Sequence, residues 1–128
     1  MLQINGDMVG VAHTAVDSTN TAIAVGSGSL PVFGTPCMIA LMEEATCKAI
    51  APALEDGETT VGTRIDVAHS KASGIGTSIT ATATLVDIDR RKLTFSVTAA
   101  EDDGTEIGKG VIERFVVDTE KFMSRIGA

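Results

Sequence analysis

One long helix with almost no polar face is predicted over Gly34–Ile50, GTPCMIALMEEATCKAI. A helix of this kind has to be covered by other elements, which restricts the fold more than any other part of the chain does. Pro36 suits the first helical turn, and Thr35 before it is predicted to be the N-cap. The helix is predicted to end around Pro52 and Gly57, where the apolar pattern stops. We therefore expect the remaining chain to supply a sheet that wraps the helix.

The remaining chain alternates between apolar and polar residues with the period of β-strands. A first strand is predicted at residues 8–16, and a Gly-, Ser- and Pro-rich loop separates it from the helix. Four more strands follow the helix, at residues 59–69, 77–88, 93–99 and 106–117. A short terminal helix is predicted to begin near Asp118 or Thr119. One helix packed on an antiparallel sheet is an α+β domain, and this element order predicts a hot-dog fold, as a single domain over residues 1–128.

The alternation also predicts which side chains face the core. In strand 77–88 the inward set is Ile79, Ala81, Ala83 and Leu85, with the threonines between them outward. Leu93, Phe95 and Val97 are predicted to share one face of the following strand. In strand 59–69 the predicted common face holds Thr63, Ile65, Val67 and His69.

Composition excludes several classes of protein. The net charge is −7, and the only aromatic residues are four phenylalanines, whereas nucleic-acid binding usually needs a basic face with stacking aromatics. No apolar run approaches the ~20 residues of a membrane span. The first nine residues lack the basic and apolar segments of a secretory signal. We therefore expect no nucleic acid and no membrane among the partners.

The two cysteines and two histidines give no sign of a disulfide or a metal site. Cys37 and Cys47 are ten residues apart in the predicted helix, about 15 Å along its axis, which is too far for a disulfide within one chain. His13 and His69 fall on different strands, so no metal-ligand cluster is predicted. A reduced, cytoplasmic protein without a bound metal is the expectation.

The two adjacent glutamates of the helix are predicted to do different jobs. Glu44 and Lys48 form an acid-first i, i+4 pair, which is typical of a solvated surface. Glu43 points 100° away and has no cation within helical reach, so a partner from elsewhere in the fold is needed. Glu43 is either a carboxylate at the rim that reaches water or one held at a catalytic cleft, and the helix alone leaves both open.

His69 ends a predicted strand and is followed by small and polar residues. A structural role is open, but a sheet wrapped on the helix could also bring this ring toward Glu43. A Glu and a His in one cleft supply the acid–base and orienting groups of acyl transfer. Thr35 adds a hydroxyl at the helix entrance, where free N–H groups can polarise a carbonyl, although a simple N-cap explains it equally well.

Three stretches carry a resemblance to a known family: VFGTPCMIALMEEA, VGTRIDVAHSKA and EIGKGVIERFVV. Together with the spacings Thr–x7–Glu and Gly–x6–His, they resemble the hot-dog thioesterases of the fluoroacetyl-CoA thioesterase type, over roughly Val32 to Arg125. The resemblance places the family's catalytic residues on Thr35, Glu43 and His69. It also places a glycine that shapes the acyl and water site on Gly62, and an arginine near the active site on Arg114.

The resemblance further implies a homodimer with active sites at the subunit interface, and a curled sheet with an exposed edge strand favours the same expectation. One region departs from the family pattern. The fluoroacetyl-specific enzyme has an aromatic-rich lid before its catalytic Thr, whereas Phe33 is the only aromatic residue in the corresponding residues 20–33 here. We expect Phe33 to contact the substrate. We therefore predict thioesterase chemistry without strong selection for the fluoroacetyl group.

The predicted function is hydrolysis of a small or medium acyl-CoA thioester, with no cofactor besides the CoA of the substrate. Glu43 would act as base for water or as nucleophile, His69 would orient it and shuttle protons, and Thr35 would hold the thioester or the water. The phosphates of CoA need cations, and Lys71 and the turn Arg90–Lys92 are candidates, unless they are merely solvated.

Two other functions remain open at this point. One is a non-catalytic acyl-CoA-binding module, which would bind without turnover. The other is an enoyl-CoA hydratase, although that reaction on this fold normally uses a DxNPxH-like loop, which the sequence lacks.

Overall fold

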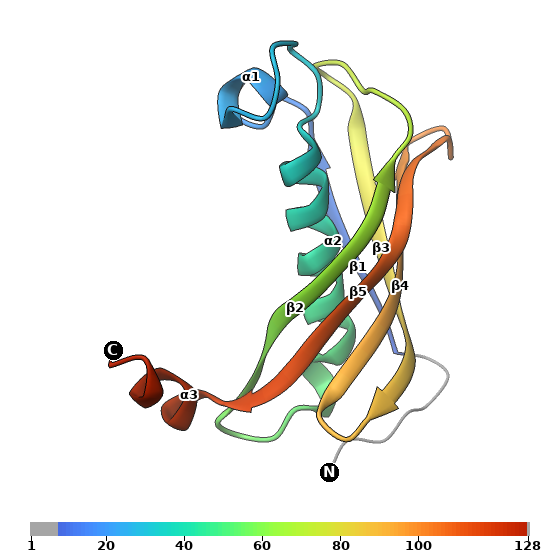
Figure 1. Ribbon diagram of the computed structural model, residues 1–128. Coiled ribbons are helices and arrows are strands. Elements are labelled where there is room, and N and C mark those ends of the chain that lie inside the picture. The colour runs from blue at the N-terminus through green and yellow to red at the C-terminus, as the bar shows by residue number, and fades with distance from the viewer. Residues whose placement is uncertain (1–7, 128) are drawn as a thin grey trace.

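A computed structural model, which describes residues 8–127, shows one antiparallel sheet curled past a long helix (Figure 1). The strands are β1 (Val9–Ala15), β2 (Glu58–His69), β3 (Ser78–Asp89), β4 (Lys92–Glu101) and β5 (Glu106–Asp118). The helical elements are α1 (Ala22–Val25), α2 (Thr35–Ile50), the 3-10 turn η1 (Ala51–Ala53) and α3 (Thr119–Arg125). The strand order in the sheet is β1-β3-β4-β5-β2, so β1 and β2 are the two edges. The predicted α+β architecture is confirmed.

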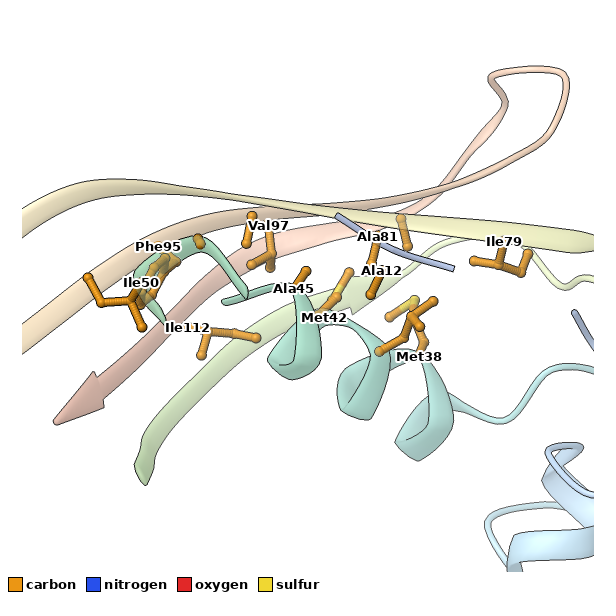
Figure 2. Packing of buried hydrophobic residues seen from close by; sticks show 14 of the residues in the cluster. Ala12, Met38, Met42, Ala45, Ile50, Ile79, Ala81, Phe95, Val97 and Ile112 are labelled. Atoms are coloured by element: carbon orange, nitrogen blue, oxygen red, sulfur yellow. The ribbon is translucent and has the colours of Figure 1, made fainter. Parts of the chain in front are cut away.

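The core lies between α2 and the concave face of the sheet. Met38, Met42 and Ala45 of α2 are fully buried and point toward the strands (Figure 2). Ile79, Ala81, Ala83 and Leu85 of β3 are buried, as are Leu93, Phe95 and Val97 of β4. The predicted inward faces of these two strands are therefore confirmed, because alternate side chains of a pleated strand must point to the same side.

The helix and β1 approach each other unusually closely. A side chain at Gly10 of β1 would overlap the backbone of Ala45 and Ala49 in α2. Glycine at this position lets the strand cross the helix at backbone distance, so α2 is pressed against the β1 side of the sheet. The β2 side of the sheet has little contact with the helix. The candidate site lies on this side, between α2 and the strands β2 and β5.

The sheet covers α2 on one side only, which differs from the predicted complete wrapping. Ala40, Glu44, Cys47 and Lys48 are exposed along the opposite side of the helix. Ala40 and Cys47 on this side are small and apolar, which explains why the helix reads as apolar nearly all round in the sequence. The helix thus carries a second face that its own chain leaves uncovered.

Strand β2 contains an irregularity that the alternation did not predict. Gly62 pairs with Arg114 and Arg64 pairs with Glu113, so Thr63 is an extra residue in the ladder. Beyond this β-bulge, Ile65 and His69 return to the face of the sheet that points to α2. The bulge bends the strand beside Gly62, and such bulges are frequent next to active sites.

One local prediction was wrong. Gly34 is the N-cap of α2 and Thr35 is already helical, with no side-chain hydrogen bond capping the helix. The short helix α1, at the start of the predicted Gly-, Ser- and Pro-rich loop, was not predicted, and its N-cap Thr21 accepts a hydrogen bond from the Ala24 amide. The predicted lack of a secretory signal concerns residues 1–9, of which residues 1–7 lie outside the described residues. Within 8–127, no helix is long and apolar enough to cross a membrane.

Candidate active site

The first residue of α2 and the last residue of β2 meet at one end of the molecule. Thr35 Oγ1 and His69 Nδ1 share a hydrogen bond of 2.8 Å. The two residues can meet because the C-terminal end of β2 lies at the same end of the fold as the start of α2 (Figure 1). Since Gly34 takes the N-cap position, the Thr35 hydroxyl is free to contact the imidazole rather than to cap the helix.

His69 is held as a neutral imidazole with one unused nitrogen. Burial lowers the pKa of His69 from its ordinary value of 6.5, and the backbone of Lys71 opposes the shift. The ring is therefore neutral at pH 7. Its Nε2 atom is buried and has no hydrogen-bond partner among the described residues. A buried, unsatisfied nitrogen next to a hydroxyl is the arrangement expected of a proton acceptor or donor that awaits a substrate.

Glu43 has the partner that its own helix does not supply. Arg114 Nη1 of β5 donates to Glu43 Oε2 at 3.0 Å, in a charge-assisted hydrogen bond. The Arg114 side chain is 8% exposed and the Glu43 side chain 37%. The buried guanidinium fixes one carboxylate oxygen, while the carboxylate as a whole still reaches the surface of the chain.

The Arg114 side chain is held in place by hydrogen bonds to Thr60 of β2. Its Nε donates to Thr60 Oγ1 at 2.9 Å and its Nη2 donates to the Thr60 carbonyl at 3.0 Å. Three directional bonds leave the guanidinium little freedom, so the position of the Glu43 carboxylate is set by two strands distant in sequence. Sequence analysis missed Thr60, because a threonine in an alternating strand carries no distinguishing signal.

Gly62 provides the space beside the carboxylate. A Cβ at this position would lie 2.5 Å from Glu43 Oε2 and 3.4 Å from Arg114 Nη1. Any larger residue would therefore displace the Glu43 carboxylate. The glycine predicted to shape the site is found next to the predicted catalytic acid.

A pocket of about 250 Å³ opens in front of the threonine and histidine. Its lining includes Phe33, Thr35, His69 and Lys71, together with Ala22 of α1. Phe33 is 2% exposed and also lines a second cavity of about 240 Å³, whose lining includes Cys37. The segment that contains α1 thus forms a wall of the pocket.

The structure brings the predicted site residues together in two groups rather than one. Thr35 and His69 form the first group, and Glu43, Gly62 and Arg114 form the second. Eight residues of helix separate Thr35 from Glu43, about 12 Å along the axis. The expected approach of His69 to Glu43 does not occur within one chain, because each residue is bonded to another partner at a different level of the helix.

The neighbouring Glu44 confirms the contrast drawn from the sequence. Its carboxylate forms the predicted i, i+4 ion pair with Lys48 at 3.1 Å, and both side chains are more than half exposed. Such pairs contribute only a few tenths of a kcal/mol. Among residues 8–127, no group of three His, Cys, Asp or Glu side chains is placed to hold a metal ion.

Comparison with known proteins identifies the class. The chain superimposes on the solved structure of the fluoroacetyl-CoA thioesterase FlK with a TM-score of 0.88 and 34% identity, over 97% of this chain and 96% of that one. It superimposes on a Thermus thermophilus hypothetical protein of the thioesterase superfamily with a TM-score of 0.90 and 25% identity, over 98% and 93% of the two chains. The fold is that of a hot-dog thioesterase.

The sequence comparisons narrow this class to a family. The profile of the family described as fluoroacetyl-CoA-specific thioesterase matches residues 16–120. A curated relative, the fluoroacetyl-CoA thioesterase of Streptantibioticus cattleyicolor, is 43% identical over 95 residues, which cover 74% of this chain and 68% of the relative. The chain belongs to the fluoroacetyl-CoA-specific thioesterase family. The predictions of a hot-dog fold and of a thioester hydrolase are confirmed.

Proposed function

We propose that this protein hydrolyses small or medium acyl-CoA thioesters with Glu43 as the reacting carboxylate. The observation that carries the proposal is the support of Glu43: a buried arginine holds one carboxylate oxygen at 3.0 Å, and the absence of a side chain at Gly62 leaves room for that oxygen. A glutamate that only reached water at the surface would need neither the buried arginine nor the glycine. Positioning of this kind is what a carboxylate needs to attack a carbonyl carbon or to deprotonate water.

The chemistry then proceeds at the thioester carbonyl. As a nucleophile, Glu43 attacks the carbonyl carbon, the C–S bond breaks, CoA leaves as a thiolate that takes up a proton, and water hydrolyses the resulting anhydride. As a general base, Glu43 takes a proton from water, the hydroxide attacks the same carbon, the C–S bond breaks, and the proton passes to the departing thiolate of CoA. Both routes consume one water, release an acid and CoA, and require no cofactor or metal.

Thr35 and His69 are proposed to act on the other side of the reacting group. His69 is neutral and has Nε2 free, so it can take up a proton during the reaction and pass it to the departing thiolate. The hydrogen bond to Thr35 holds the ring in place. Phe33 supplies an apolar wall for the acyl group in the pocket next to them.

A homodimer explains how the two groups can serve one substrate. Glu43 and the Thr35–His69 pair lie about 12 Å apart along one helix, so a second copy related by a two-fold axis is proposed to bring Glu43 to the partner's Thr35–His69 pair. Strand β2 is an edge of the sheet, and the side of α2 that carries Ala40 and Cys47 is exposed. Both surfaces are available to a second copy.

We place the reaction in a reducing compartment, the cytoplasm, because Cys37 and Cys47 are both free thiols.

The direct test is a thiol-release assay across acyl-CoA substrates from acetyl to octanoyl. Hydrolysis of the shorter chains supports the proposal. Tight binding of acyl-CoA without thiol release at any chain length would show a binding module instead.

A further inference from the structure

Lys71 brings a positive charge to the pocket in front of Thr35 and His69. Of the described residues that line this pocket, Lys71 alone carries a permanent charge. Its side chain is 46% exposed, so solvent weakens the field of the ammonium group but does not remove it. An unpaired ammonium group at this place would attract an acyl group that carries a carboxylate of its own.

A carboxylate from outside the pocket holds this ammonium group. Lys71 Nζ donates to Glu101 Oε1 at 2.9 Å and to Glu101 Oε2 at 2.8 Å. Glu101 is the last residue of β4, and the β4–β5 turn lies at the same end of the fold as the end of β2 (Figure 1). The Glu101 side chain is 13% exposed and is not among the described residues that line the pocket. Glu101 therefore acts on the pocket only through Lys71.

A buried serine fixes Glu101 and ties it to the pocket wall. Ser73 is 2% exposed, and its hydroxyl donates to Glu101 Oε2 at 2.7 Å. The carbonyl of the same serine accepts a hydrogen bond from the Phe33 amide at 2.8 Å. The carboxylate is thus held in one place relative to Phe33, which is a wall of the pocket.

The charges of this pair cancel at neutral pH. Hydrogen bonds from Lys71 and Ser73 lower the pKa of Glu101, so its carboxylate is ionised at pH 7. Asp103 also feels the charge of Lys71, but it is exposed, and its pKa is lowered chiefly by its hydrogen bonds to Thr105. Glu101 is therefore the main counter-charge of the one cation in the pocket lining.

We propose that Glu101 determines specificity, because its pairing with Lys71 keeps the pocket electrically neutral and favours uncharged acyl groups over acyl groups with a terminal carboxylate. The proposal rests on the proposed thioesterase function, in which this pocket receives the acyl group. Without Glu101, the ammonium group of Lys71 is free to pair with a carboxylate in the pocket. Without Lys71, the charge of Glu101 repels that carboxylate. Removing either member of the pair therefore shifts the substrate preference in opposite directions.

The ratio of kcat/KM for succinyl-CoA to kcat/KM for butyryl-CoA measures this preference, because both acyl groups have four carbons and only the first is charged. We expect a ratio below one in the wild type, a rise of roughly fivefold in Glu101→Gln and a fall of roughly fivefold in Lys71→Gln. Lys71 is half exposed, so Lys71→Gln tests the charge even if Glu101→Gln does not fold.

Two further variants control for structural effects. The double variant Lys71→Gln/Glu101→Gln has no charge at the pair and is expected to return the ratio to within about twofold of the wild type. Glu106→Gln removes an exposed carboxylate at the start of β5 and is expected to leave the ratio unchanged. Glu43 is the same in all variants, so its charge cancels from the comparison.

Binding of uncleavable thioethers separates the pocket from the proposed function. S-Butyl-CoA and S-(3-carboxypropyl)-CoA bind without turnover, and calorimetry of the two is expected to give the same opposite shifts. These shifts in a protein that hydrolyses no acyl-CoA would overturn the function and support the role of Glu101. Equal losses for succinyl-CoA and butyryl-CoA in both single variants, or a wild type that prefers succinyl-CoA, would overturn the role of Glu101 and leave the function standing.

Discussion

Arg114 and Glu43 meet at 3.0 Å although 71 positions separate them in the sequence. The arginine comes from β5 and is fixed by Thr60 of β2, so the carboxylate on α2 is held by two strands at once. Removing one partner of such a buried interaction leaves the other without its counter-charge. This pair therefore links the stability of the sheet–helix contact to the geometry of the candidate site.

Glu43→Gln is expected to abolish thioester hydrolysis, with a loss of roughly 10³-fold in kcat. The amide keeps the size of the side chain and can still accept from Arg114, but it neither attacks a carbonyl nor takes a proton from water. Glu44→Gln is the matched control, because its carboxylate lies on the exposed ion pair with Lys48. Thiol release measures both, and equal losses in the two variants would show that the wrong carboxylate was chosen.

Gly62→Ala is expected to lower kcat/KM by about 10²-fold with little change in Tm. The new Cβ would lie 2.5 Å from Glu43 Oε2, which is the end of a flexible side chain, so the carboxylate moves and the backbone does not. Gly74→Ala serves as the control, since a Cβ there meets nothing within 4 Å. Full activity of Gly62→Ala would mean that the exact place of the carboxylate is unimportant.

His69 is expected to make the protein less stable as the pH falls. Burial lowers its folded-state pKa below the ordinary 6.5, so the unfolded chain binds the proton more tightly than the native state does. The free energy of unfolding should therefore decrease as the pH drops through 6.5 and level off below the folded pKa. Chemical denaturation at several pH values measures this, and the His69→Gln variant should show a shallower dependence between pH 7 and 5. An identical slope in both proteins would contradict a buried neutral imidazole.

A homodimer is expected at micromolar concentration, with a mass of twice 13.2 kDa by light scattering. Ile65→Asp should shift the protein toward the monomer and reduce hydrolysis, because Ile65 is 39% exposed on the edge strand β2, at the face that points to α2. Val86→Asp is the control, since Val86 is exposed on β3, away from that edge. A monomeric wild-type protein with full activity would exclude a site shared between copies.

Fluoroacetyl-CoA is expected to be preferred over acetyl-CoA by no more than about 1–3 kcal/mol in transition-state binding. The segment that walls the pocket contributes Ala22, Ser27 and Val32, and its only aromatic residue is the buried Phe33. One small substituent in such an apolar pocket allows limited discrimination. The ratio of kcat/KM for the two substrates is the measurement, and a preference of many thousandfold would show that another feature selects fluorine.

Much of the fold can be predicted from the sequence, because strand alternation and helical spacing are local patterns. The alternation in β3 and β4 predicted the buried faces, since a strand's two faces are set by the pleat alone. The exposed pair of Glu44 and Lys48 followed from helical spacing in the same way. The bulge at Thr63 was not predictable, because it depends on how β2 pairs with β5 and leaves no mark in the composition of the strand.

The candidate site also combines features that are local in the sequence with features that depend on tertiary packing. The sequence by itself determined that Glu43 has no cation three or four residues away on its helix and that Thr35, Gly62 and His69 stand at spacings typical of the family. Only the tertiary structure decided that Arg114 pairs with Glu43 and that His69 pairs with Thr35. These pairings depend on the strand order, which places β5 and β2 next to each other and brings the end of β2 to the start of α2. Contacts between elements far apart in the chain are fixed by packing, and no spacing along the sequence encodes them.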